Sequence, residues 1–375
     1  MNLLKNTKFS GYEITMNKLW CYAKKNKIIL PTNEPPTKSA FSQARDKLPA
    51  YVIHDLLIKS GKRFDNIYGK KYLWKGHRLL AIDGTKYTLP ASPELIKKYQ
   101  RQNCGYTEAH YPQATLLVLF NVESKIAYDV IIENIRANER KELKKIVNSC
   151  IDNDILIMDR GYPSYETIDF LQRKKILFLM RCPSKSTFKA VEEFIKSNQN
   201  DLITEMKNKK KKLKVRLIKT KGPEPKIYIT NIFDQIKYSY DEISEVYGKR
   251  WEIEEHYKVN KELFKVESFH SKKDNGIKQE IYSQLILSNM TRMLMNEAES
   301  KNTDKDKKDE PSFKNAVIIV EEYFNEILCN NDREKLVSLF PEILKAIRRV
   351  RYKKRLNRHF PRKSHCYYSK WYTKT

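Results

Sequence analysis

The chain has 375 residues, which at about 150 residues per domain allows two or three domains with a large core. Its 73 lysines and arginines against 46 aspartates and glutamates give a formal charge of +27, while 40% of the residues are hydrophobic. These values exclude a disordered or disulfide-stapled peptide. The charge indicates a surface that binds a polyanion, or a compositional bias toward Lys, Asn and Ile that needs no partner.

Neither a cysteine metal site nor a membrane anchor is expected. The six cysteines include no CxxC pair, so they match neither a zinc ribbon nor a disulfide framework. The first residues lack the apolar core of a signal peptide, and the longest apolar run, LLVLF, is too short to span a bilayer. We therefore expect reduced cysteines and a soluble, cytoplasmic protein.

Residues 1–75 are expected to form a small helical domain, with a turn-forming stretch between its helices. Within it, Phe41, Ala44 and Leu48 are spaced i, i+3 and i+7 and predict one apolar helix face. The opposite face would present Arg45 to solvent or to DNA. We assign Arg45 to DNA binding, with a merely solvated face as the alternative.

From residue 79 the hydrophobic period changes toward two. The segments LLAIDGTKYTLP, ATLLVLFNVES and KIAYDVIIENI predict an antiparallel meander of three strands. A helix at 139–150, an apolar strand, a second helix and another apolar strand follow, which predicts a βαβ unit. We place the first part of an α/β core at 76–183.

The second half of the chain begins with a break in this alternation. Two strand-like pieces around the turn KGPEP predict a β-rich insertion over 184–238, and a long helical stretch at 239–299 completes the core. The region 300–375 is expected to be helical and basic. After Glu342 it contains twelve Lys or Arg, no acidic residue and several aromatic residues. Such a tail suits nucleic acid better than a solvated helix does.

Two carboxylates stand at the ends of apolar strands. Asp83 ends LLAI and Asp159 ends ILIM, positions where a carboxylate is costly to bury unless it is paired or binds a cation. Open α/β sheets place ligand chemistry at the carboxyl ends of their strands. The alternatives are an ordinary Asp-Gly turn at Asp83 and a helix cap at Asp159.

A third carboxylate belongs to the helical segment YGKRWEIEEHYKVNKELFK. At 100° per residue, four of its side chains project within an arc of about 60°: Tyr247, Arg250, Glu254 and Lys261. Acid, base and phenol are thus mixed where a core stripe would be apolar. A solvated face of salt bridges is the alternative, and Glu255 and Glu262 at the edge of the arc leave the choice of glutamate open.

Carboxylates from two strands and one helix form the donor set of a two-metal site. Two Mg²⁺ ions about 3.5 to 4 Å apart activate a water or a 3′-hydroxyl and stabilise the leaving oxygen of a phosphoryl displacement. The pattern therefore predicts Asp83, Asp159 and Glu254 as catalytic metal ligands, with Mn²⁺ as a substitute for Mg²⁺. The tyrosine, arginine and lysine of the stripe would hold phosphates beside the metals.

The chain resembles the DDE insertion-sequence transposases that carry the Y-(2)-R-(3)-E-(6)-K signature, which stands here as the stripe from Tyr247 to Lys261. Other motifs share the resemblance in the same order: AIDGTKYTLP, HYPQA, DRGYPSYETI, YITNI and RLNRHFPRK. It covers residues 37–364. It implies an RNase H-like mixed sheet flanked by helices, with the first aspartate on the first strand, the second after the fourth strand and the glutamate on a late helix.

The resemblance also implies an activity. Metal-dependent cleavage exposes 3′-hydroxyls at the ends of an insertion sequence, and these attack target DNA. A homodimer would synapse two double-stranded ends with terminal inverted repeats. The signature tyrosine, arginine and lysine would grip the terminal strand, including a phosphate beside a flipped base. Residues 1–75 would read the end sequence, and Arg358 and Arg362 of the basic tail would bind DNA.

Two features leave alternatives open. In one branch an indole helps to extrude the base; its position falls here at Lys226, and Tyr228 is the candidate substitute, which makes a hairpin intermediate less certain than the DDE chemistry. The alternative functions are a catalytically inactive or regulatory protein that binds DNA ends, and a structure-specific nuclease without strand transfer. The intact triad favours the transposase.

Overall fold

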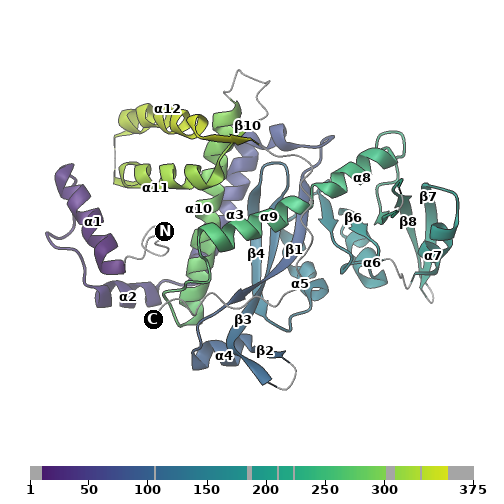
Figure 1. Ribbon diagram of the computed structural model, residues 1–375, viewed down its shortest axis with the longest axis horizontal. Coiled ribbons are helices and arrows are strands. Elements are labelled where there is room, and N and C mark those ends of the chain that lie inside the picture. Colours follow the sequence, from purple (N-terminus) through teal and green to yellow (C-terminus); the bar gives the residue numbers. More distant parts are fainter. Residues whose placement is uncertain are drawn as a thin grey trace.

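The computed structural model describes residues 11–104, 107–183, 188–208, 211–222, 224–300, 309–329 and 332–353. Helices form one end of the molecule, a large sheet lies in the middle, and a smaller β-rich part forms the other end (Figure 1). Among these residues, no helix is both long and apolar enough to cross a membrane.

A nine-stranded mixed sheet is the centre of the fold, and β4, β3, β1, β5 and β6 are successive neighbours in it. Its strands are β1 (Leu79–Thr88), β2 (Arg101–Cys104), β3 (Thr107–Asn121), β4 (Ile126–Asn134), β5 (Ile155–Met158), β6 (Leu177–Arg181), β7 (Asp201–Asn208), β8 (Lys211–Lys219) and β9 (Ile227–Thr230). The pairs β1–β3 and β3–β4 are antiparallel, whereas β1–β5 and β5–β6 are parallel. This arrangement confirms the predicted meander, the βαβ unit and the RNase H-like fold class.

Helices cover both faces of the sheet (Figure 1). They are α1 (Tyr12–Lys25), α2 (Lys38–Lys47), α3 (Ala50–Tyr68), α4 (Pro93–Tyr99), α5 (Glu139–Ile146), α6 (Tyr165–Arg173), α7 (Lys189–Lys196), α8 (Tyr240–Gly248), α9 (Trp251–Leu263), α10 (Asp274–Ser300), α11 (Phe313–Cys329) and α12 (Arg333–Arg349). Two short 3₁₀ turns (Gly69–Tyr72 and Val147–Ser149) and an antiparallel pair, β10 (Asp309–Pro311) with β11 (Arg351–Lys353), complete the described elements.

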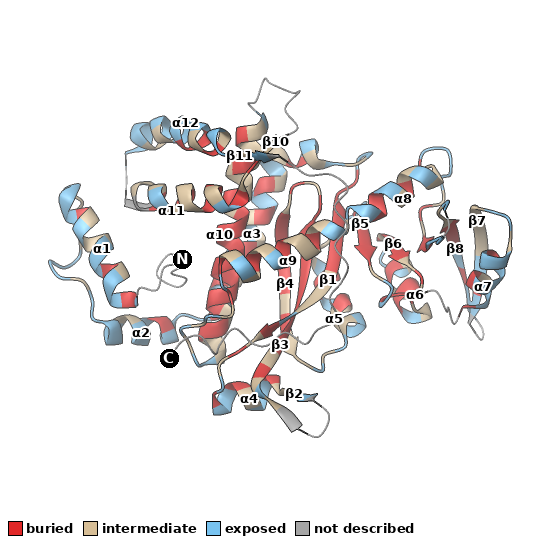
Figure 2. Ribbon diagram, viewed as in Figure 1, coloured by how far each residue is buried: buried red, intermediate tan, exposed pale blue. Residues whose placement is uncertain are grey.

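The alternation of side chains along β1 explains the layers. Leu79 and Ala81 belong to the hydrophobic cluster that includes α8, α9 and α10, whereas Leu80 and Ile82 belong to the cluster of α5, α6 and α7. A strand buried on both faces is apolar throughout, which is why β1 and β5 begin as continuous apolar runs. Helix α10 is buried along most of its length, as the red ribbon at the centre of Figure 2 shows.

The β-rich insertion and helix α3 of the N-terminal region are both joined directly to the core. The strands of the β-rich insertion do not form a sheet of their own, because β9 pairs antiparallel with β6 and extends the central sheet through β8 to β7. At the other end, α3 packs against α10 and β4, so this helix is joined to the core. The short elements α4 and β2, between the first two predicted strands, were not predicted.

Candidate active site

The two aspartates lie side by side at the carboxyl ends of parallel strands. Ile82 of β1 pairs with Met158 of β5, and the next residue on each strand is Asp83 and Asp159. Side chains alternate between the two faces along a strand, and each aspartate follows residues of its strand that pack in the same hydrophobic cluster as α9 at every second position. Both aspartates therefore face the α9 side of the sheet. The open edge predicted for ligand chemistry therefore carries both carboxylates.

The signature segment crosses this face as two consecutive helices. Helix α8 begins at a capping box in which Ser239 and Glu242 bond reciprocally, and it ends at Gly248; α9 starts at Trp251 and packs on β1 (Figure 1). The residues between them keep right-handed helical backbone angles. Glu254 in the first turn of α9 is thereby brought toward Asp83.

Arg250 joins the first and third carboxylates. Its Nη2 donates to Oε1 of Glu254, and its Nη1 lies 3.5 Å from Oδ2 of Asp83. The Arg250 side chain is 13% exposed, and its buried Nε has no hydrogen-bond partner in the described part of the chain. A guanidinium thus supplies positive charge between two carboxylates without being fully bonded itself.

Burial makes Asp83 the most perturbed carboxylate of the group. Loss of hydration raises the pKa of Asp83 to about 7; Arg250 opposes this shift, whereas Asp159 and Glu254 add to it by charge repulsion. The Tyr257 hydroxyl donates to the carbonyl oxygen of Asp83 at 2.6 Å and fixes the strand there. The three predicted carboxylates therefore share one electrostatic environment.

Tyr247 is buried beside this group. Its ring lies 4.5 Å from that of Tyr228, centroid to centroid, and burial raises its pKa to about 12, opposed by Arg250 and assisted by Asp159. Tyr228 is 3% exposed beneath it, so it does not offer the open stacking surface that the sequence suggested for a flipped base. Lys226 is exposed just before β9.

Lys261 lies farther along β1 than the carboxylates. Its ammonium donates to the Lys86 carbonyl at 2.8 Å and lies 5.4 Å from the centre of the Tyr87 ring. Burial lowers its pKa. The four signature residues therefore do not form one group. The tyrosine, arginine and glutamate lie near the two aspartates, whereas the lysine lies farther along β1, beside Lys86 and Tyr87.

Sequence reasoning missed a basic residue at the same edge. Arg181 ends β6 one strand beyond Asp159, because Met158 pairs with Met180 in parallel register. Arg181 lies two residues after Leu179, which packs in the same hydrophobic cluster as α9, so both side chains face that side of the sheet. Its positive charge opposes the rise in the pKa of both Tyr247 and Tyr228. The Arg181 side chain makes no hydrogen bond or ion pair to another described residue, whereas its backbone pairs with Tyr228 of β9. A charged residue ending an apolar strand, as Asp159 does, was the available signal.

The prediction that Arg45 faces solvent or DNA is wrong. Its Nε donates to Gln279 Oε1 at 2.9 Å, and its Nη2 donates to Glu280 Oε1 at 2.8 Å, inside the contact between α2 and α10. Ala44 and Leu48, which were predicted to be buried, are exposed instead. A buried carboxylate on α10 required a cation, and this requirement outweighed the apolar pattern of α2. Arg358 and Arg362 lie outside the described residues.

The donor set fits a divalent cation in its chemistry. Carboxylate oxygens are the ligands that Mg²⁺ prefers; the pKa of Asp83 is raised by burial first and then by repulsion from Asp159 and Glu254, and a cation would relieve that repulsion. Over the described residues, no three acidic, His or Cys side chains are arranged as a metal site, and Arg250 holds the position between Asp83 and Glu254. The residue types suit the metal, whereas their arrangement here, with Arg250 between Asp83 and Glu254, is not that of a metal site.

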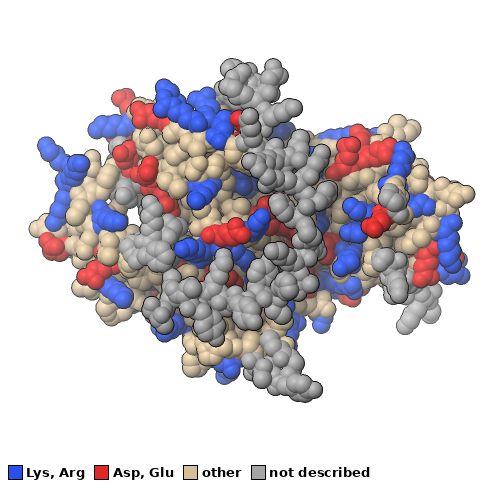
Figure 3. Space-filling view, in the orientation of Figure 1, with Lys and Arg blue, Asp and Glu red and all other residues tan. Residues whose placement is uncertain are grey.

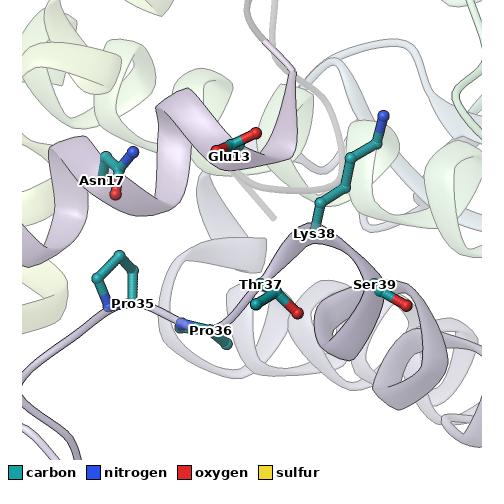
Figure 4. Close-up of a pocket in the computed structure, with 7 residues that line it drawn as sticks. All are labelled: Glu13, Asn17, Pro35, Pro36, Thr37, Lys38 and Ser39. Carbon is teal, nitrogen blue, oxygen red and sulfur yellow. The ribbon is translucent and has the colours of Figure 1, made fainter.

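A pocket of about 350 Å³ lies elsewhere, between α1 and the segment that leads into α2 (Figures 1 and 4). Its lining contains one carboxylate and one amine and no group of paired catalytic side chains: Glu13, Asn17, Pro35, Pro36, Thr37, Lys38 and Ser39. This pocket therefore lacks the group of neighbouring carboxylates that Asp83, Asp159 and Glu254 provide.

The chain belongs to the transposase DDE domain family, which matches residues 74–290, more than half of its length. It is 24% identical over 286 residues to transposase InsG of insertion sequence element IS4 from Escherichia coli K12, over 72% of this chain and 63% of InsG. It is 27% identical over 141 residues to the putative transposase InsZ of the same organism, over 36% of this chain and 46% of InsZ.

The aligned regions span less than two thirds of either relative. Among solved structures, the piggyBac transposase synaptic complex with hairpin DNA aligns at a TM-score of 0.45 with 11% identity, over 91% of this chain and 84% of that chain.

Proposed function

We propose that this protein cleaves the ends of an insertion sequence by two-metal phosphodiester hydrolysis and joins the 3′-hydroxyls to target DNA. The observation that carries the proposal is the meeting of Asp83, Asp159 and Glu254 in one electrostatic environment at the open edge of the sheet. Hard oxygen donors at this edge suit phosphoryl transfer.

Each side chain has a role in this proposal. When bound by Asp83, Asp159 and Glu254, Mg²⁺ or Mn²⁺ would activate the attacking oxygen and stabilise the leaving one. Arg250 would leave the carboxylates to pair with a DNA phosphate, for which its planar fork of donors is suited. Tyr257 would keep the backbone of Asp83 in place through its hydrogen bond.

The phosphates would follow the basic groups along the site. Arg181 and Tyr247 lie on the β6 side of Asp159, and Lys261 lies on the far side of Asp83 along β1. We assign these three to the DNA strand that enters the site. Because Tyr228 is buried under Tyr247, a hairpin step that requires an exposed aromatic surface is not included in the proposal.

The partners follow from charge. Double-stranded DNA ends with terminal inverted repeats and target DNA would bind the chain, whose charge is +27, as a nucleoid-associated homodimer. Lysines and arginines gather over α12 in the upper part of Figure 3, and α12 precedes the basic tail with Arg358 and Arg362. We assign α12 and this tail to backbone contacts, and the N-terminal helices without Arg45 to the end sequence.

The test is a strand-cleavage assay on a duplex that ends in the inverted repeat of the same element, with Mg²⁺ and with EDTA. We expect metal-dependent nicking at the end that is lost in Asp83→Asn, Asp159→Asn and Glu254→Gln, while end binding remains. Glu262→Gln, an exposed change two turns along α9, is the matched control and should cleave normally.

The same assay separates the alternatives. Binding without cleavage in any metal would indicate an inactive or regulatory protein that binds DNA ends. Cleavage without joined product would indicate a nuclease that lacks strand transfer. Full cleavage by Glu254→Gln would refute the carboxylate assignment itself.

A further inference from the structure

A fourth carboxylate, that of Glu139, lies against β1 next to Asp83. Glu139 is the first residue of α5, and its carboxylate occupies the space that a side chain at Gly84 would need. A Cβ at position 84 would lie 2.3 Å from Oε1 and 2.7 Å from Cδ of Glu139. Gly84 does not have a positive φ, so its role is to provide space rather than an unusual backbone conformation.

The other carboxylate oxygen of Glu139 is held by the turn that carries Asp159. The Tyr162 hydroxyl donates to Oε2 of Glu139 at 2.9 Å, and the Tyr162 amide donates to the Asp159 carbonyl at 3.3 Å. In addition, Nε of Arg140 donates to the Gly161 carbonyl at 2.7 Å and ties the start of α5 to the same turn. Glu139 is thus positioned by residues adjacent to both predicted catalytic aspartates.

Glu139 approaches from the opposite face of the sheet, yet the sheet is open at this point. Strand β5 pairs with β1 only as far as Met158 and Ile82, so no β5 residue pairs with β1 at Gly84. The Gly84 amide donates to Oδ1 of Asp83 at 3.0 Å, and Oε1 of Glu139 lies against the open side of the same glycine. The two carboxylates therefore approach Gly84 from the two faces of the sheet.

Within the described part of the chain, no basic side chain pairs with Glu139. Among the described residues its hydrogen-bond partner is the neutral Tyr162 hydroxyl, and it forms no ion pair with a described lysine or arginine. Glu166 of α6, by contrast, is exposed and pairs with Lys144. As the first residue of α5, Glu139 carries a carboxylate that the helix N-terminus favours and that stays available to a bound cation.

We propose that Glu139 is a fourth carboxylate ligand of the metal centre, binding a divalent cation together with Asp83. The inference rests on the proposed function, and it adds a residue outside the three carboxylates of the signature triad. Gly84 then has a defined purpose, since any larger residue would push the Glu139 carboxylate away from the site.

The test is the affinity of the DNA-free protein for Mn²⁺, measured by calorimetry and by electron paramagnetic resonance, so it does not depend on cleavage. We expect Glu139→Gln to weaken Mn²⁺ binding by about tenfold or more. Gly84→Ala, which keeps Glu139 but fills its space, should weaken binding in the same direction. Glu166→Gln removes an exposed carboxylate of α6 and should bind Mn²⁺ as the unmodified protein does.

Further variants separate the possible failures. Tyr162→Phe keeps the carboxylate and removes its hydrogen bond, so it should weaken Mn²⁺ binding less than Glu139→Gln; thermal unfolding checks that each variant is folded. If Asp83→Asn loses Mn²⁺ binding while folded Glu139→Gln keeps full affinity, the Glu139 proposal is wrong and the metal site stands. If neither Asp83→Asn nor Glu254→Gln affects Mn²⁺ binding or cleavage, the proposed function is wrong.

Discussion

Two arginine–glutamate contacts in this molecule, Arg45 with Glu280 and Arg250 with Glu254, use the same residue types for different purposes. Arg45 is buried between α2 and α10, where it donates to Gln279, Glu280, the Gly276 carbonyl and the Tyr12 hydroxyl. Arg250 donates to Glu254, lies 3.5 Å from Asp83, and leaves its Nε without a hydrogen bond.

The difference lies in how completely each arginine is bonded. Arg45 pairs with a carboxylate that is itself fully buried and also accepts from the backbone amides of His270 and Ser271, so removing the arginine would take the guanidinium away from a charge that has no access to water. Arg250 neutralises carboxylates that are partly exposed and that a cation can neutralise equally well. The first contact stabilises the fold, and the second can exchange partners.

The largest expected effect is on stability at the first contact. Arg45→Met should lower the free energy of unfolding by about 3 to 5 kcal/mol, because the fully buried Glu280 loses the guanidinium that lies 2.8 Å from it. Arg250→Met should lower it by less, since the side chains of Glu254 and Asp83 are 28% and 20% exposed and Asp83, whose pKa is about 7, can take up a proton. Urea denaturation of both variants measures the difference. Equal losses in the two variants would remove the distinction between the contacts.

The second prediction concerns the core side of α9, two residues beyond Glu254. His256 is buried against Phe120 and bonded to Asn260, and burial lowers its pKa to about 3. The unfolded chain takes up a proton below about pH 6.5 that the folded chain does not, so stability falls as the pH falls. The loss should be at most about 1.4 kcal/mol per pH unit down to about pH 3.

Unfolding at pH 7.5 and pH 5 checks this prediction. His256→Gln should reduce the dependence on pH, whereas His110→Gln, a change at an exposed histidine, should leave it as it is. A pH dependence that is identical in His256→Gln and the unmodified protein would show that His256 is not the neutral buried group described above.

The third prediction tests whether Arg250 competes with a metal. Arg250→Gln should raise the affinity of the DNA-free protein for Mn²⁺ by about tenfold, because the guanidinium no longer occupies the space between the carboxylates or repels the cation. Lys249→Gln is the matched control: it removes the same charge from the adjacent residue, which pairs with Glu123. An equal gain in both variants would indicate a general charge effect, and no gain in either would contradict the competition.

The sequence predicted the strands and the central carboxylates for a clear physical reason. Apolar runs with strand periodicity mark β1, β3, β4, β5 and β6, and a carboxylate that ends such a run is conspicuous. The angular pattern of the signature also indicated that Arg250 and Glu254 share a face. These signals are local, so they can be seen without knowing the fold.

The residues that were missed or misassigned depend on distant partners. The burial of Arg45 is determined by Glu280, 235 residues away in the chain. The position of Glu139 depends on the space at Gly84 and on the Tyr162 hydroxyl, neither of which marks Glu139 in the sequence. Arg181 reaches the site through the register of β5 with β6. Local patterns contain no information about such pairings.

The smallest predicted effect belongs to Arg181, a cation without a carboxylate partner among the described residues, at the edge that carries Asp159. If it contacts one DNA phosphate, Arg181→Gln should weaken end binding a few-fold and reduce the slope of log affinity against log salt by about 0.9. Arg173→Gln is the control, since that arginine already pairs with Asp169 on α6. An unchanged slope in Arg181→Gln would mean that its charge does not meet DNA. A reduced slope would add a third kind of arginine to the comparison of the two contacts: one that has no anionic partner among the described residues until DNA binds.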